Sequence, residues 1–281
     1  MEYGLPDYEF IQQFMNWEGG HFSKSRDRGV FVDEAVEMYP ADYWRFYIAR
    51  KLPTEQDTDF SWSEFEAETN SVLNDTVGNF VNRTLSLAEQ WFDSEVPTAE
   101  LRPEDREVEE EALKVVDEYI EAFENHDLRT GVEKATEIAR IGDQYLSEEE
   151  PWNNEERREE TIHVSLHLIR ALGVMLYPYT PEASQKISEM LKIEMHTEEG
   201  DDELVEPLLG NLNSGHELGE KEILFEKIDV SDQKDGNKNE EASDENMKKG
   251  LVSFDELQNM DLRVGEVLEV EDHPNADKLY K

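Results

Sequence analysis

The sequence predicts a mainly α-helical protein, with a bundle of helices as its largest part. Three observations lead to this prediction. Apolar residues recur at i, i+3 and i+4 through most of residues 63–192. Prolines interrupt the periodic stretches, as at Pro97, Pro103 and Pro151. The chain has 281 residues, which is too many for one small core, so we expect two or three domains.

The first part of the chain, residues 1–62, has mixed local patterns. Aromatic residues and Ile over 8–16 predict a buried strand that runs into a turn at Gly19-Gly20. Residues 33–50 have helical apolar spacing with a break at Pro40. Residues 52–62 are polar and predict a loop.

Five helices are predicted to form the bundle. The clearest covers residues 63–92, and its apolar stripe includes Leu73, Val77, Val81 and Ala88. The other four are expected at 105–125, 128–146, 155–177 and 181–192. Each has one apolar face, so together they predict a helical bundle of about 130 residues.

The remainder of the chain differs in composition. Residues 231–249 contain almost nothing that could be buried and predict a disordered acidic linker. Beyond it, Leu262, Val264, Val267 and Val270 follow a strand-like pattern.

Acidic residues dominate the composition. There are 69 Asp and Glu against 27 Lys and Arg, a formal net charge of -42, and the excess extends along the whole chain. We interpret this excess as adaptation to molar salt, where a Debye length of about 3 Å screens the repulsion between like charges.

Several classes of protein are disfavoured. The absence of cysteine excludes disulfides and thiolate metal sites. No apolar run approaches the roughly 20 residues that span a bilayer, and the N-terminus does not resemble a signal peptide. We therefore expect a cytoplasmic protein without membrane contact. His163 and His167 have the i, i+4 spacing of metal ligands, but a third ligand is not evident, so no metal site is expected.

One short segment resembles a known nucleotide-binding loop. Residues His21-Phe22-Ser23-Lys24-Ser25, after Trp17-Glu18-Gly19-Gly20, resemble the Lys-Met-Ser-Lys-Ser signature loop of class I aminoacyl-tRNA synthetases. The flanking residues, including 39–47, are similar to methionyl-tRNA synthetases of archaeal type. The resemblance implies that His21, Phe22, Ser23, Lys24 and Ser25 bind ATP and that Lys24 is catalytic. His21 and Phe22 depart from the family's lysine and methionine.

Two further segments match the same family. Asn79 and Arg83 lie at i and i+4 on one face of the 63–92 helix, opposite its apolar stripe. The resemblance implies that they read anticodon bases, as residues at these positions do in methionyl-tRNA synthetases. Trp152, after Pro151, corresponds to the tryptophan that stacks on the first anticodon base. Without the family match, a solvated helix face and a core tryptophan would be the simpler interpretations.

The C-terminal residues also carry a resemblance. Asp261-Leu262-Arg263-Val264-Gly265 and 273–279 resemble the start of an OB-fold tRNA-binding domain, which several synthetases contain. The resemblance thus implies four parts. They are the end of a class I catalytic domain with its stem-contact region (1–62), an anticodon-binding bundle (63–230), the linker (231–249) and a truncated OB-like segment (250–281).

The family's function is the expectation that follows. It is the ATP-dependent attachment of methionine to tRNA(Met), with Mg²⁺ accompanying ATP. We expect a C-terminal portion, inactive alone, with the methionine pocket and the family's zinc site outside it, and a homodimer through a complete C-terminal domain. Two alternatives stay open: a non-catalytic tRNA-binding protein or half of a split synthetase, and another class I synthetase such as a cysteinyl or leucyl enzyme.

Overall fold

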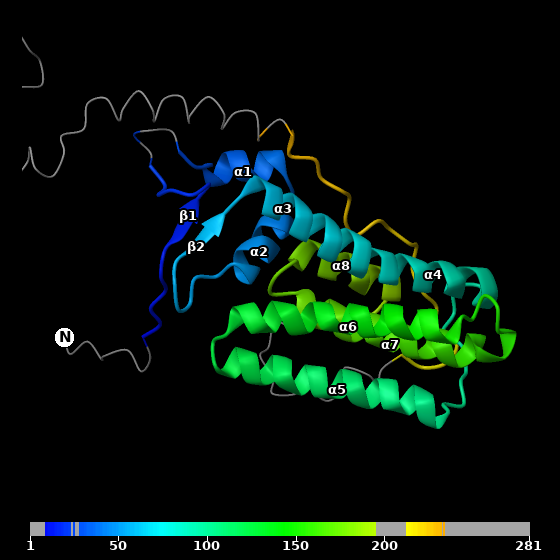
Figure 1. Cartoon of the computed structure of the whole chain (residues 1–281). Helices are drawn as coiled ribbons and strands as arrows, with labels where there is room; N and C mark the ends of the chain where they lie inside the picture. The colour runs from blue at the N-terminus through cyan, green and yellow to red at the C-terminus, as the bar shows by residue number, and fades with distance from the viewer. Residues whose placement is uncertain (1–8, 24, 26–27, 195–211, 232, 234–281) are drawn as a thin grey trace, which may run out of the picture. The chain divides into compact units, whose positions relative to one another are not determined.

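The computed structural model describes residues 9–23, 25, 28–194, 212–231 and 233. Its elements are β1 (Met15–Trp17), α1 (Val32–Met38), α2 (Ala41–Arg50), β2 (Thr58–Phe60), α3 (Trp62–Glu68), η2 (Thr69–Gly78), α4 (Asn79–Phe92), α5 (Pro103–Glu124), α6 (Leu128–Glu149), η3 (Glu155–Arg157), α7 (Arg158–Leu176) and α8 (Pro181–Leu191) (Figure 1). The prediction of a mainly helical fold is confirmed. None of the helices in these ranges has the length and apolarity to cross a membrane.

The two strands form a small parallel sheet. Met15 pairs with Thr58, and Trp17 with Phe60. The strand predicted at 8–16 is therefore shorter and lies later. The loop predicted at 52–62 is confirmed for residues 52–57 and wrong for Thr58–Phe60, which form β2. Three residues show too little alternation to be recognised, and pairing with β1 decides their conformation. The helix predicted at 33–50, with its break at Pro40, is confirmed by α1 and α2.

Aromatic side chains pack this first region together. Trp17 stacks on Phe60 with 4.1 Å between ring centroids and 6° between ring planes. Trp44 stacks on Phe65 at 4.5 Å, and Trp62 meets Phe60 edge-on at 5.1 Å. Aromatic pairs of this kind each contribute about 0.5–1.5 kcal/mol beyond the area they bury. The cluster thus fixes the sheet against α2 and α3.

Asp42 joins α2 to the bundle. Its buried carboxylate accepts hydrogen bonds from the backbone N–H groups of Ala183 (2.8 Å) and Glu182 (3.4 Å), in the first turn of α8. These groups have no partner within their own helix. Burial raises the pKa of Asp42, although the two backbone hydrogen bonds oppose this shift. Arg45 donates to the carbonyl of Pro178 at 2.6 Å, so α2 is bonded across the start of α8.

The helix predicted at 63–92 is continuous but not uniform. Between α3 and α4, the segment η2 is a π-helix of 10 residues. This stretch is rich in Asn, Ser and Thr, whose side chains compete for backbone hydrogen bonds. The hydroxyl of Thr76, for instance, donates to the carbonyl of Ser71 at 3.0 Å. A sequence argument based on 3.6 residues per turn does not detect this widened turn.

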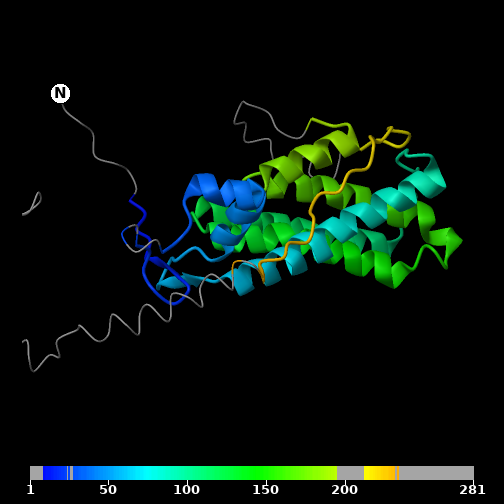
Figure 2. The ribbon, with the colours of Figure 1, turned by 90° about the horizontal axis from the view of Figure 1, so that it is seen from above.

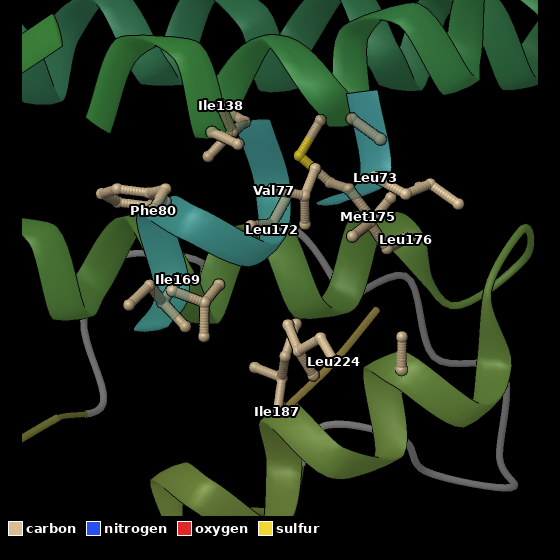
Figure 3. Packing of buried hydrophobic residues seen from close by; sticks show 14 of the residues in the cluster. Leu73, Val77, Phe80, Ile138, Ile169, Leu172, Met175, Leu176, Ile187 and Leu224 are labelled. Carbon is tan, nitrogen blue, oxygen red and sulfur yellow. The ribbon is translucent and has the colours of Figure 1, made fainter. Parts of the chain in front are cut away.

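The core lies between α4, α6, α7 and α8 and includes η2 (Figure 3). Gly142 on α6 is required where α4 approaches. A Cβ atom at residue 142 would lie only 2.1 Å from the ring of Phe80, which is fully buried. The absence of a side chain therefore lets α4 and α6 pack closely at this point.

A mostly irregular segment, residues 212–231, runs back along the helices (Figure 2). We call it the return segment. Asn70 exchanges two hydrogen bonds with the backbone of Ile228, at 2.9 and 2.8 Å, and Asn74 donates to the carbonyl of Phe225 at 2.7 Å. Leu224 lies near Ile187 in the core (Figure 3). The Asn side chains of η2 thus replace the backbone partners that a strand would offer.

The acidic linker (231–249), apart from Ser231 and Gln233, and the OB-like segment (250–281) lie outside the described residues.

Candidate functional site

A tight turn introduces the loop that resembles the signature. Glu18 and Gly19 both have positive φ (46° and 75°), as a type I′ turn requires. The backbones of Trp17 and Gly20 exchange hydrogen bonds of 2.6 and 3.1 Å. The carboxylate of Asp59 on β2 accepts from the N–H of Gly19 at 3.0 Å. The turn is therefore bonded to the neighbouring strand.

The loop itself is closed by backbone pairing. Ser23 and Arg28 exchange two hydrogen bonds of 3.0 Å, and the hydroxyls of Ser23 and Ser25 are 3.4 Å apart. Arg28 donates to the carbonyl of Glu18 at 2.8 Å. Phe22 packs on Trp17, with 5.2 Å between ring centroids.

The predicted catalytic residue belongs to the same segment of the sequence. Lys24 lies outside the described residues, as do Arg26 and Asp27. Of the other predicted ATP-binding residues, His21, Phe22 and Ser25 are exposed, and Ser23 is partly buried. The structure thus shows how the base of the loop is fixed, while the role of Lys24 stays a prediction.

The predicted base-reading residues lie on and beside α4. Arg83 forms an ion pair with Asp143 of α6, and its guanidinium carbon lies 5.3 Å from the centroid of the Trp152 ring. The Trp152 side chain is 40% exposed. Asn79 is exposed one turn earlier and donates to the carbonyl of Asp75 at 3.0 Å. The structure thus brings Arg83 and Trp152 into contact and leaves Asn79 nearby.

Uncharged polar side chains of α4 lie next to this pair, and Lys221 of the return segment donates to the hydroxyl of Ser86 at 2.8 Å. Asn79, Asn82, Ser86 and Gln90 share one face of α4 by helical spacing. A hollow of about 270 Å³ is lined by Asn82, Arg83, Ser86, Leu87 and Trp152. Amides, a hydroxyl, a guanidinium and an indole together match the edges and faces of unstacked nucleobases.

Close helix packing explains why Arg83 meets Asp143. Phe80 and Gly142 pack against each other, and Arg83 and Asp143 follow them on the same two helices. Sequence reasoning missed Asp143, because one carboxylate among 69 acidic residues carries no local signal.

His163 and His167 each lie within hydrogen-bond distance of a backbone carbonyl. His163 and His167 lie with 4.5 Å between ring centroids. The Nδ1 of His163 lies 2.9 Å from the carbonyl of Pro97, and the Nε2 of His167 lies 3.2 Å from that of Leu212. In the part of the chain that the structure describes, no group of three or more His, Asp or Glu side chains is arranged to hold a metal ion.

Comparison with protein families agrees with this geometry. A model described as class I tRNA synthetases (M) matches residues 1–85. A model described as the anticodon-binding domain of methionyl tRNA ligase matches residues 96–244, more than half of the chain.

Curated relatives of this chain are named methionine–tRNA ligases. The methionine–tRNA ligase of Pyrococcus horikoshii is 30% identical, and the alignment covers 99% of this chain and 45% of that protein. The methionine–tRNA ligase of Chloroherpeton thalassium is 36% identical, with 100% and 43% covered. This chain therefore spans somewhat less than half the length of these relatives.

Solved structures show the same fold. The free form of Mycobacterium tuberculosis methionyl-tRNA synthetase matches with a TM-score of 0.67 at 21% identity, over 80% of this chain and 45% of that one. Its complex with methionyl-adenylate matches with a TM-score of 0.68 at 22% identity, over 77% and 43%. The predicted resemblance is confirmed, and the comparisons favour it over other class I synthetases. Since the anticodon-binding model covers more than half of the chain, this protein belongs to the methionine–tRNA ligase family.

Proposed function

We propose that this chain forms the signature-loop and anticodon-binding parts of an enzyme that attaches methionine to tRNA(Met) with ATP. The observation that carries the proposal is the contact of Arg83 with Trp152 beside a hollow that Asn82 and Ser86 of α4 also line. The chain spans less than half the length of the relatives, so the activity of the whole enzyme is part of the proposal.

In this proposal, the protein recognises tRNA through its anticodon bases. Trp152 offers its ring face to an anticodon base, while Asn79 and Arg83 offer hydrogen bonds to base edges. A chain with a formal charge of -42 does not attract tRNA through its overall field. Phosphate contacts also weaken as salt rises, whereas stacking is less sensitive to screening.

The signature loop supplies the ATP-binding part. We assign Lys24 to the phosphates of ATP, where an ammonium stabilises the charge that develops as pyrophosphate departs. The exposed Ser25 and the partly buried Ser23 offer hydroxyl donors beside it. Mg²⁺ would accompany ATP as part of the substrate. The methionine pocket and the zinc site of the family are assigned to other parts of the enzyme.

The proposal also covers the salt environment and the oligomeric state of the enzyme. We assign it to a cytoplasm of molar salt, because the acidic excess favours a compact fold only when charges are screened. A homodimer would form through the OB-like region. Circular dichroism across a KCl series tests the salt assignment, and equal helix content and melting temperature at low and molar KCl would contradict it.

Affinity measurements test the recognition site. At molar KCl, wild-type protein is expected to bind tRNA with the CAU anticodon more tightly than matched tRNAs with altered anticodons. Trp152→Ala is expected to cost about 1–3 kcal/mol of this affinity, with helix content unchanged, because the ring is partly exposed. Tyr177→Ala, at another exposed aromatic residue of the bundle, is the control. Equal affinity of the wild type for all tRNAs would contradict the proposal.

A further inference from the structure

The loop that presents Trp152 lies between α6 and α7. A partly exposed ring receives little positional constraint from the core, yet this ring contacts Arg83 on α4. Part of the constraint is local. Glu150 has a φ of 43°, and its carbonyl accepts from the N–H groups of Asn153 and Asn154 at 2.8 and 2.9 Å. These bonds shape the turn but do not fix it relative to the helices.

Arg157 closes the base of this loop. It is only 4% exposed, and it forms ion pairs with Glu149, the last residue of α6, and with Asp105 in the first turn of α5. Its guanidinium also lies 3.7 Å from the carboxylate of Glu160 on α7. The residues immediately before and after the loop are thus joined to each other and to a third helix.

Asp105 is held in its charged form within this cluster. Burial would raise the pKa of this carboxyl, but hydrogen bonds from Arg157, from Tyr145 and from the N–H of Arg102 outweigh burial and lower the pKa. The Tyr145 hydroxyl donates at 2.6 Å and the Arg102 N–H at 2.8 Å. Burial also limits screening by salt, unlike the pair between Arg83 and Asp143, whose side chains are 38% and 42% exposed.

Arg158 provides a second connection. Its Nε donates to the carbonyl of Pro151, the residue before Trp152, at 3.2 Å. Its guanidinium carbon lies 4.4 Å from the ring centroid of Trp91 on α4. The backbone next to Trp152 is therefore joined to the helix that carries Arg83.

We propose that Arg157 and Arg158 are positioning residues, which orient Trp152 for an anticodon base through the buried ion pairs and the Pro151 contact. This inference rests on the proposed function. A buried ion cluster is a poor source of net stability, because desolvation opposes the attraction, and its better-attested use is to specify one arrangement. A single arrangement of the Trp152 loop is what stacking at a fixed place requires.

The test measures anticodon discrimination and local order in the full chain. Arg157→Lys keeps the charge but loses the planar fork that contacts two carboxylates. Arg158→Gln removes the contact with Trp91 and changes the donor to Pro151. Each variant is expected to lose about tenfold in the affinity ratio between tRNAs with CAU and altered anticodons, most of what one stacked base supplies. Arg158→Lys is expected to recover part of the loss. Arg129→Lys, at an exposed ion pair on α6, is the control.

Tryptophan fluorescence separates positioning from folding. Acrylamide quenching of each variant is compared with the same variant carrying Trp152→Phe, so that the difference reports on Trp152 alone. Increased quenching of Trp152, with unchanged circular dichroism, supports positioning. If Arg157→Lys does not fold, the result for Arg158→Gln decides.

Two outcomes distinguish a failure of the proposed function from a failure of the positioning proposal. If the wild type does not discriminate between anticodons, the proposed function fails. If the wild type discriminates and Trp152→Ala does not, while folded Arg157→Lys and Arg158→Gln discriminate like the wild type, the positioning proposal is overturned.

Discussion

The N-terminal region (residues 9–65) and the helical bundle (79–191) differ in how many of their apolar side chains are buried. Among the described residues, nine of fourteen exposed large hydrophobic side chains lie between residues 10 and 48, and α1 buries none of its residues. In the bundle, by contrast, α7 buries most of its length. The bundle thus buries most of its large apolar side chains, whereas the N-terminal region leaves more of them exposed.

This difference extends to the two candidate sites. The bundle presents Arg83 from α4 and Trp152 from the loop between α6 and α7, beside a well-packed core. The signature loop has a bonded base and exposed side chains such as Phe22. We therefore expect substitutions in the bundle to act on folding and tRNA affinity, and substitutions in the loop to act on catalysis alone.

The largest expected effect compares the same deletion in the two regions. Phe80→Ala should destabilise the protein by about 3–5 kcal/mol, because the ring is fully buried against Gly142. Phe31→Ala, where the ring is 47% exposed before α1, should cost less than about 1 kcal/mol. Denaturant unfolding at molar KCl measures both. Similar losses at the two positions would remove the distinction between the regions.

The buried cluster gives the second prediction. Asp105→Asn should destabilise the bundle by about 3 kcal/mol at neutral pH, because it leaves Arg157 without its innermost partner. The folded-state pKa of Asp105 is lowered, so its contribution is present above the unfolded pKa of about 4 and is lost as pH falls through the folded value.

The free energies of unfolding of wild type and Asp105→Asn measure this effect at a series of pH values. Their difference should stay constant from about pH 7 to pH 5 and shrink below about pH 4. Taking the difference removes the contribution of the other acids. A difference that persists in stronger acid would show that the charge of Asp105 is not its source.

The third prediction separates catalysis from recognition. In the synthetase that contains this chain, Lys24→Ala should slow ATP–pyrophosphate exchange by about a hundredfold and leave tRNA affinity unchanged. Such a loss would mark an interaction made mainly in the transition state. Trp152→Ala should instead weaken tRNA affinity and leave the rate of ATP–pyrophosphate exchange unchanged. An exchange rate within about twofold of wild type would refute the assignment of Lys24.

The smallest effect concerns an exposed ion pair. Asp143→Ala should change stability by less than about 1 kcal/mol, because the pair with Arg83 is largely solvated. The loss should disappear at molar KCl, whereas that of Asp105→Asn should remain. Thermal unfolding at molar KCl, and at the lowest concentration that keeps the wild type folded, measures both. An equal dependence on salt would show that burial does not distinguish the two pairs.

Sequence patterns predicted the long helices well. The apolar periods of α5 to α8 each contain enough turns to define a buried face, and prolines mark their starts, as at Pro103 and Pro181. The short strand β2 and the return segment were missed. Their conformations depend on partners far away in the chain, such as Met15 for Thr58 and Asn70 for Ile228.

The sequence by itself determined the residue types of the candidate site. Asn79, Arg83 and Trp152 were selected by resemblance to methionyl-tRNA synthetases, and their base-reading role stays a prediction. Only the tertiary structure decided that Arg83 contacts Trp152 and Asp143, and that Arg157 lies among three carboxylates. Helical periodicity is a property of neighbouring residues. Which carboxylate meets which arginine depends on how closely two helices approach, and here Gly142 against Phe80 sets that distance for α4 and α6.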